Sequence, residues 1–133
     1  MSETINLEVP ATLEALSTVR MVLGGLGARL DFSLEELEDL YLATDELLRA
    51  AIVAERLDRV AIAISLADDA LLIATDALTS PELRRDIERS PAGDCLDLCT
   101  LLTSTVDRVR LDAAVSGRYR VVLEKRHAAG GGA

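Results

Sequence analysis

Five short segments of the chain are expected to be strands, and the first three of them alternate between apolar and polar or small residues with a period of two, which is typical of half-buried strands. These segments cover residues 5–9, 60–66, 71–75, 106–111 and 119–123. The turn at residues 67–70 joins the second segment to the third, and a turn near Ser116 and Gly117 joins the last two. The pattern therefore predicts one strand followed by two hairpins.

Two longer segments show apolar residues at steps of three and four, which predicts amphipathic helices. The first runs from about Thr12 to Leu30, and Arg20 lies off its apolar stripe. The second begins at a capping box formed by Ser33 and Glu36 and is expected to reach about Ala54. Its expected buried stripe is Leu34, Leu37, Tyr41, Thr44, Leu48 and Ala51.

Three glycines near the end of the first helix allow two interpretations. Gly24, Gly25 and Gly27 each cost about 1 kcal/mol relative to alanine inside a helix. They indicate either weakened last turns or close packing of another element on the helix. Two shorter helices are expected at residues 81–89, with a proline at the start, and at 96–102.

The order of elements is strand, two helices, hairpin, loop with a short helix, helix and hairpin. We therefore expect an α+β fold, specifically a two-layer α/β sandwich in which a mixed, mostly antiparallel sheet carries its helices on one face. A chain of 133 residues is long enough for one domain, which we place at residues 1–126. The low-complexity tail at residues 127–133 is expected to be disordered.

Composition narrows the class of protein. The formal net charge is -9, which argues against nucleic acid as a direct partner because phosphate binding depends on Lys and Arg. No segment has the length of apolar sequence that a membrane span needs, so we expect no membrane contact and a cytoplasmic location. Cys95 and Cys99 are interpreted as two buried structural thiols, and with His127 alone in the tail no metal site is expected.

Four strings give the chain a resemblance to a known family. These are VPATLEALSTVR, FSLEELEDLYLATDELLRAAI, IATDALTS and AGDCLDL, which lie in this order between Ile5 and Lys125. Together they resemble the anti-sigma-factor serine kinases, members of the histidine-kinase-like ATPase superfamily. The resemblance implies that superfamily's ATPase fold and a homodimer. It also implies partner binding by Arg20, because Arg20 matches a family arginine that contacts the sigma factor and its antagonist.

The resemblance implies an ATP site whose residues are partly replaced here. Glu46 matches the family's glutamate, a catalytic base, although a solvated helix carboxylate is the plain alternative. A helix places the residue four positions later on the same face, where the family has a magnesium-binding asparagine. This chain has Ala50 there, and a methyl group offers no oxygen to a hard cation.

The other two family elements of the site are also altered. Asp76 matches the aspartate that accepts a hydrogen bond from adenine, but Leu78 replaces the first glycine after it. An ordinary turn-starting aspartate remains the alternative. Gly93 is retained in the phosphate-binding turn, whereas Cys95 replaces the second glycine, and Asp94 and Asp97 add negative charge. We therefore expect no bound cofactor, with ATP and magnesium only if this degenerate pocket is competent.

Three functions follow from this sequence. The first is a regulatory domain that binds a sigma factor, an anti-sigma-factor antagonist or both, with a degenerate ATP site. The second is an active serine/threonine kinase that phosphorylates such an antagonist, with Glu46 as its base. The third is an unrelated α+β domain, since a shared fold does not assign a function.

Overall fold

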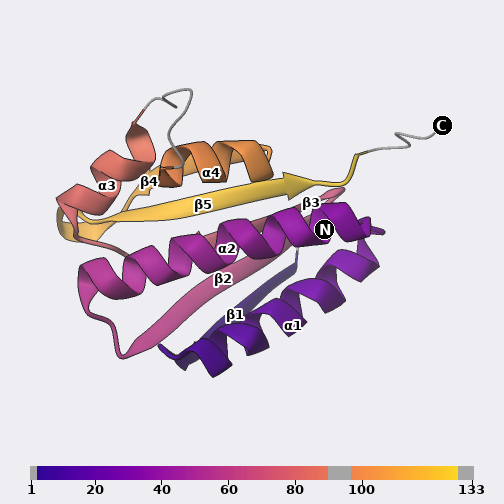
Figure 1. Ribbon diagram of the computed structural model, residues 1–133, viewed down its shortest axis with the longest axis horizontal. Helices are drawn as coiled ribbons and strands as arrows, with labels where there is room; N and C mark the ends of the chain where they lie inside the picture. Colours follow the sequence, from indigo (N-terminus) through magenta and orange to yellow (C-terminus); the bar gives the residue numbers. More distant parts are fainter. Residues whose placement is uncertain (1–2, 90–96, 129–133) are drawn as a thin grey trace.

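The computed structural model describes residues 3–89 and 97–128, and its five strands form one sheet in the order β1-β2-β3-β5-β4 (Figure 1). Every pairing between these strands is antiparallel. The strands are β1 (Glu3–Pro10), β2 (Arg59–Ala67), β3 (Ala70–Thr75), β4 (Arg108–Ala113) and β5 (Tyr119–Arg126). The expected α+β sandwich is confirmed.

Alternation along β2 explains how the sheet presents one apolar face to the helices. Val60, Ile62, Ile64 and Leu66 are buried, whereas the residues between them are half-exposed. Ile64 stands opposite Ile5 in β1 and Ile73 in β3, so one row of isoleucines crosses three strands. Such cross-strand pairs of branched side chains stabilise the register of a sheet.

The helices lie over this face of the sheet (Figure 1). They are α1 (Leu13–Arg29), α2 (Leu34–Glu55), α3 (Pro81–Glu88) and α4 (Leu98–Thr105), and a 3-10 turn, η1, lies at Val115–Gly117. The side chains of Thr12, Ser33, Ser80 and Asp97 each cap one α-helix by accepting a backbone N–H. The capping box of Ser33 and Glu36 is present with both of its hydrogen bonds.

The expected stripe of α2 was partly wrong. Leu34 is 71% exposed, and Leu37 and Tyr41 are only partly buried. The face that is buried consists of Leu40, Ala43, Thr44, Leu47, Leu48 and Ala51. Helix α2 packs against the sheet and also against helices on its flanks. The face that it buries is therefore broader than the predicted stripe of apolar residues at steps of three and four, and its centre lies elsewhere on the helix. In α1, Leu13 is likewise exposed, because it is the first helical residue and lies before the packed region.

Several element boundaries differ from the expected ones by one to three residues, most clearly at α4, β4 and β5. Helix α4 begins after its cap Asp97, and β4 begins after Val106, whose N–H still bonds to Leu102 at the helix end. Strand β5 continues to Arg126 because it remains paired with β3 as far as Ala70. Long-range pairing of this kind is not visible in local periodicity.

Close packing explains two of the three glycines of α1, and the helix continues through all three of them. A Cβ atom on Gly24 would lie 2.5 Å from Oη of Tyr41, and one on Gly27 would collide with Cδ2 of Leu37. Gly25 faces open space. Gly24 and Gly27 therefore let α1 approach α2 closely, whereas Gly25 has no packing role.

The chain after β5 packs onto the start of α2. The carboxylate of Glu36 accepts hydrogen bonds from the N–H of Ser33 at 2.7 Å and of Ala128 at 2.7 Å, and lies 3.1 Å from Nδ1 of His127. The ring of His127 stacks on Phe32. Residues 127 and 128, expected to belong to the tail, thus bind the fold, and residues 129–133 lie outside the described chain.

Replacing the glycines of α1 by alanine separates packing from helix propensity. Gly27→Ala is expected to lower the free energy of unfolding by about 1–2 kcal/mol, because the added methyl overpacks against Leu37 and Phe32. Gly25→Ala is expected to raise it by up to about 1 kcal/mol. Urea denaturation of both variants checks this, and equal effects at the two positions would refute the packing explanation.

The Glu36 interaction predicts a pH dependence of stability. Partial burial opposes ionisation of Glu36, but the hydrogen bonds from Ser33, Ala128 and His127 outweigh it and lower the pKa to about 2 from an ordinary 4.5. The stabilisation from ionised Glu36 is therefore complete above pH 4.5 and is lost as the pH falls from there toward 2. Denaturation between pH 6 and pH 3 should show a shallower loss for Glu36→Gln than for wild type. The exposed neighbour variant Glu35→Gln is the control and should follow wild type.

Candidate functional site

Glu46 and Ala50 lie together in a cavity of about 480 Å³ between α2, α3 and α4. One helical turn separates the two residues, so both face the same side of α2. Helix α3 contributes Glu82, Leu83 and Asp86 to the lining, and α4 with its cap contributes Asp97, Leu98 and Leu101. We call this space the helical cavity.

The helical cavity is acidic. Its described lining contains the carboxyl side chains of Glu46, Glu82, Asp86 and Asp97, against the single basic side chain of Arg49. The hydrogen bond from the backbone N–H of Thr100 lowers the pKa of Asp97, and the charge of Arg89 acts in the same direction. A polyphosphate would therefore meet repulsion in this space, because like charges repel most strongly where water is partly excluded.

Cys99 follows the cap of α4 and is 5% exposed. Burial raises the pKa of its thiol, and the negative charge of Asp97 adds to this effect. A thiol held protonated in this way is a poor nucleophile and a poor metal ligand. The structural role expected for Cys99 fits its position, while Cys95 lies outside the described residues.

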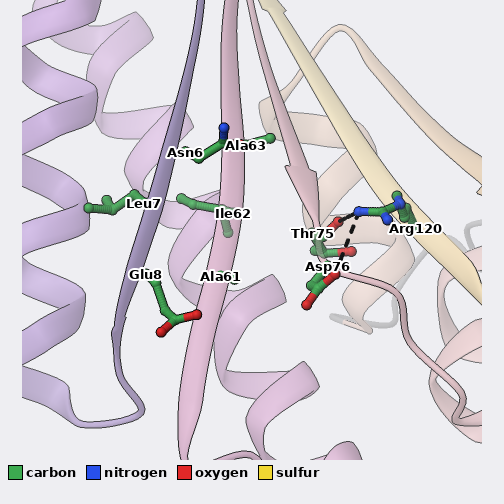
Figure 2. A pocket seen from close by; sticks show the side chains of 9 residues that line it. All are labelled: Asn6, Leu7, Glu8, Ala61, Ile62, Ala63, Thr75, Asp76 and Arg120. Atoms are coloured by element: carbon green, nitrogen blue, oxygen red, sulfur yellow. Dashed lines mark hydrogen bonds and ion pairs between the residues drawn. The ribbon is translucent and has the colours of Figure 1, made fainter.

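Asp76 follows β3 and contributes to a different pocket at the end of the sheet (Figure 2). Its carboxylate lies 3.6 Å from the guanidinium of Arg120 and accepts the N–H of Ala77 at 2.8 Å. The neighbouring Thr75 is buried and accepts the N–H of Val121 through its hydroxyl. Asp76 is therefore held at the end of the sheet by local partners, and its side chain is 69% exposed.

Leu78 follows Asp76 by two residues and does not belong to the described lining of the helical cavity. It is 3% exposed, belongs to the hydrophobic core, and exchanges two backbone hydrogen bonds with Tyr119. Together with Asp76 it lines a second space of about 220 Å³, which contacts Leu48 and Ala51 on the buried face of α2. Glu46 and Ala50 instead line the helical cavity, on another side of the same helix.

The segment between these two spaces is anchored by side chains that sequence reasoning missed. Glu55, at the end of α2, accepts the N–H groups of Thr79 at 3.1 Å and Ser80 at 2.6 Å. The hydroxyl of Tyr119 donates to the carbonyl of Ser80 at 2.6 Å. Burial, with the nearby charge of Glu55, raises the pKa of Tyr119 to about 12, so this donor remains protonated. No local signal reveals these contacts, because their partners are 25 and 39 residues apart.

Arg20 lies on the opposite flank of α2, where α1 packs. Its guanidinium forms an ion pair with Asp45 and stacks at 5.3 Å over the ring of Tyr41. Half of the Arg20 side chain remains exposed, at 51%. The two contacts orient the guanidinium without burying it, which leaves donors available to a binding partner.

The residues of the site do not fit magnesium and ATP. Ala50 supplies no metal ligand, and within residues 3–89 and 97–128 no group of three or more His, Cys, Asp or Glu side chains is arranged to hold a metal ion. Asp76 and Glu46 border different spaces, with Leu78 packed into the core beside the former. Gly93 and Asp94, also assigned to the pocket from the sequence, lie outside the described residues.

None of the described helices is long and apolar enough to cross a membrane.

Comparison with known proteins identifies a shared fold. No family model matches the chain, and none of the curated proteins matches it. A crystal structure of the RsbU and RsbW domains of Rv1364c from Mycobacterium tuberculosis is similar, with a TM-score of 0.60 at 17% sequence identity. The similarity covers 93% of this chain but only 32% of that one, so the chain spans about a third of the length of this neighbour.

The degenerate geometry predicts that Mg-ATP binds weakly or not at all. The temperature of thermal unfolding should therefore be the same with and without millimolar Mg-ATP. A ligand present at a hundredfold excess over its dissociation constant would add about 2.7 kcal/mol of stability, which such a scan detects. Ala50→Asn alone should not restore binding, because Leu78 and the acidic lining remain. A low-micromolar dissociation constant by calorimetry, abolished by chelating magnesium, would contradict this.

Proposed function

We propose that this chain is a regulatory domain that binds a sigma factor, an anti-sigma-factor antagonist or both, without depending on Mg-ATP. One observation carries the proposal: the guanidinium of Arg20 is half-exposed and oriented by Asp45 on one flank of α2, while the residues expected to hold nucleotide are split between two spaces. The neighbour of known structure contains an RsbW domain, and RsbW is an anti-sigma-factor serine kinase. The shared fold supports the general part of the proposal, a regulatory role in sigma-factor control.

The surface around Arg20 is suited to protein recognition. Arginine contributes disproportionately to the binding energy of interfaces, because its planar guanidinium pairs with carboxylates in a bidentate geometry. Met21, next to Arg20 on α1, is 75% exposed and adds an apolar side chain. Methionine is a flexible side chain that suits binding surfaces. A partner with a carboxylate beside an apolar residue would match this pair.

The kinase alternative requires one continuous pocket. Phosphoryl transfer depends on positioning and on cations that neutralise the developing charge. Glu46 lies in a cavity whose other described titratable side chains are three carboxyl groups and Arg49, and Ala50 offers no ligand. These features favour a binding domain over an enzyme. Phosphate transfer from ATP to an antagonist protein would overturn this choice.

Arg20→Ala is expected to weaken binding of the partner at least about tenfold, which corresponds to ~1.4 kcal/mol. The fold should be unaffected, because an exposed ion pair such as Arg20 with Asp45 contributes only about 0–1 kcal/mol. Arg29→Ala is the matched control, since Arg29 is an exposed arginine of the same helix that pairs with Glu3. Its affinity should equal that of wild type.

The measurement uses the sigma factors and antagonist proteins of the native host, each purified and titrated against the immobilised chain. Circular dichroism confirms that both arginine variants are folded. If no sigma factor or antagonist binds, the proposed function is wrong. If partners bind but the two variants behave alike, Arg20 has no special part in the interface.

A further inference from the structure

The helical cavity has an apolar floor that no described element covers. Leu98 and Leu101 of α4 are half-buried at its side, and Val53 of α2 is 78% exposed. Ala50 and Ala54 leave room between them because their side chains are short. A volume of about 480 Å³ lies within the range of spaces that bind ligands, roughly 300–1,000 Å³.

The rim of the cavity is negatively charged on three sides. Glu46 comes from α2, Glu82 and Asp86 from α3, and Asp97 from the start of α4. The ion pairs of α3 neutralise this rim only weakly, since Arg85 lies 4.0 Å from Glu82, Arg89 lies 3.6 Å from Asp86, and all four side chains are more than half exposed. Glu46 makes no ion pair within the described residues.

Asp97 is the carboxylate that the start of α4 contributes to this rim. Its Oδ1 accepts the N–H of Thr100, but its Oδ2 is buried and has no hydrogen-bond partner within the described residues. The guanidinium of Arg89, at 3.8 Å, is too distant for a hydrogen bond. The side chain of Asp97 is 16% exposed, and its negative charge, only distantly paired with Arg89, adds to the acidity of the rim.

We propose that the helical cavity binds a cationic, amphipathic segment of a partner protein, and not a nucleotide. Apolar side chains of that segment would pack on Val53, Leu98 and Leu101, while its Arg or Lys side chains would pair with the acidic rim. This is the usual way in which an amphipathic helix enters an apolar groove. Nucleic acids and anionic membranes are disfavoured as occupants, because their phosphates would face the same carboxylates. The inference rests on the proposed function and adds the chemistry of a partner contact.

The test uses a fluorescein-labelled amphipathic peptide with Leu and Arg at helical spacing, and a twin peptide in which Glu replaces each Arg. Fluorescence polarisation with wild-type protein at ~0.15 M salt should show saturable binding of the Arg peptide and none of the Glu peptide. The double variant Glu46→Arg with Asp86→Arg should weaken binding at least about tenfold, or ~1.4 kcal/mol. Ala50→Trp, which fills the cavity without changing its charge, should weaken binding similarly.

The matched control is Glu35→Arg with Glu38→Arg, which changes the net charge equally on exposed positions of α2. Glu38 lies two helical turns before Glu46, about 12 Å along the axis. That distance exceeds the Debye length of about 8 Å at this salt concentration, so the control should lose less than about twofold in affinity. Circular dichroism verifies that each variant is folded.

Four results would overturn the inference: no binding of the Arg peptide, equal binding of its Glu twin, equal weakening by the two double variants, or unchanged binding to Ala50→Trp. The peptides require neither a sigma factor nor an antagonist, so they test the cavity alone. If the peptides bind as expected but no sigma factor or antagonist binds, the proposed function is refuted. The inference that the helical cavity binds a cationic amphipathic segment is then retained. If a sigma factor or antagonist binds but the Arg peptide does not, this inference is refuted and the proposed function is retained.

Discussion

Helix α2 is packed on three sides, and the positions of all the other helices depend on how those sides are filled. Its buried face of Leu40, Ala43, Leu47, Leu48 and Ala51 lies on the sheet, where apolar burial contributes about 25 cal/mol per Å². One flank receives α1, and the other receives α3 and α4 (Figure 1). On α2 itself, the candidate residues Glu46 and Ala50 lie on the flank beside α3 and α4.

The two flanks of α2 differ in how closely they are packed and in charge. On the α1 side, Gly24 and Gly27 allow α1 to approach α2 closely, and Arg20 of α1 forms an ion pair with Asp45 of α2. On the other side, the helices leave the acidic helical cavity beside Glu46 and Ala50. The closely packed flank therefore carries the half-exposed guanidinium of Arg20 from α1, and the open flank carries carboxylates around apolar side chains.

The path of the chain after β3 determines what the open flank can hold. Leu78 enters the core and pairs with Tyr119, after which Glu55 and Tyr119 anchor the start of α3. This anchoring places Asp76 and Glu46 at separate spaces, although local spacing gives no reason to separate them. Leu78 is thus part of the core, whereas Ala50 lines the helical cavity.

The sequence by itself determined the order and type of the elements, because periodicity, caps and turns act over a few residues. The capping box at Ser33 and the alternation of β2 are local signals, and both are present in the structure. The resemblance located Glu46, Ala50 and Arg20 on helices, but the sequence did not show which residues surround them. Tertiary structure alone decided which face of α2 is buried, why Gly27 and not Gly25 matters for packing, and which cavity each site residue borders. These outcomes depend on contacts between residues far apart in the chain, whose geometry exists only once the helices have packed on the sheet.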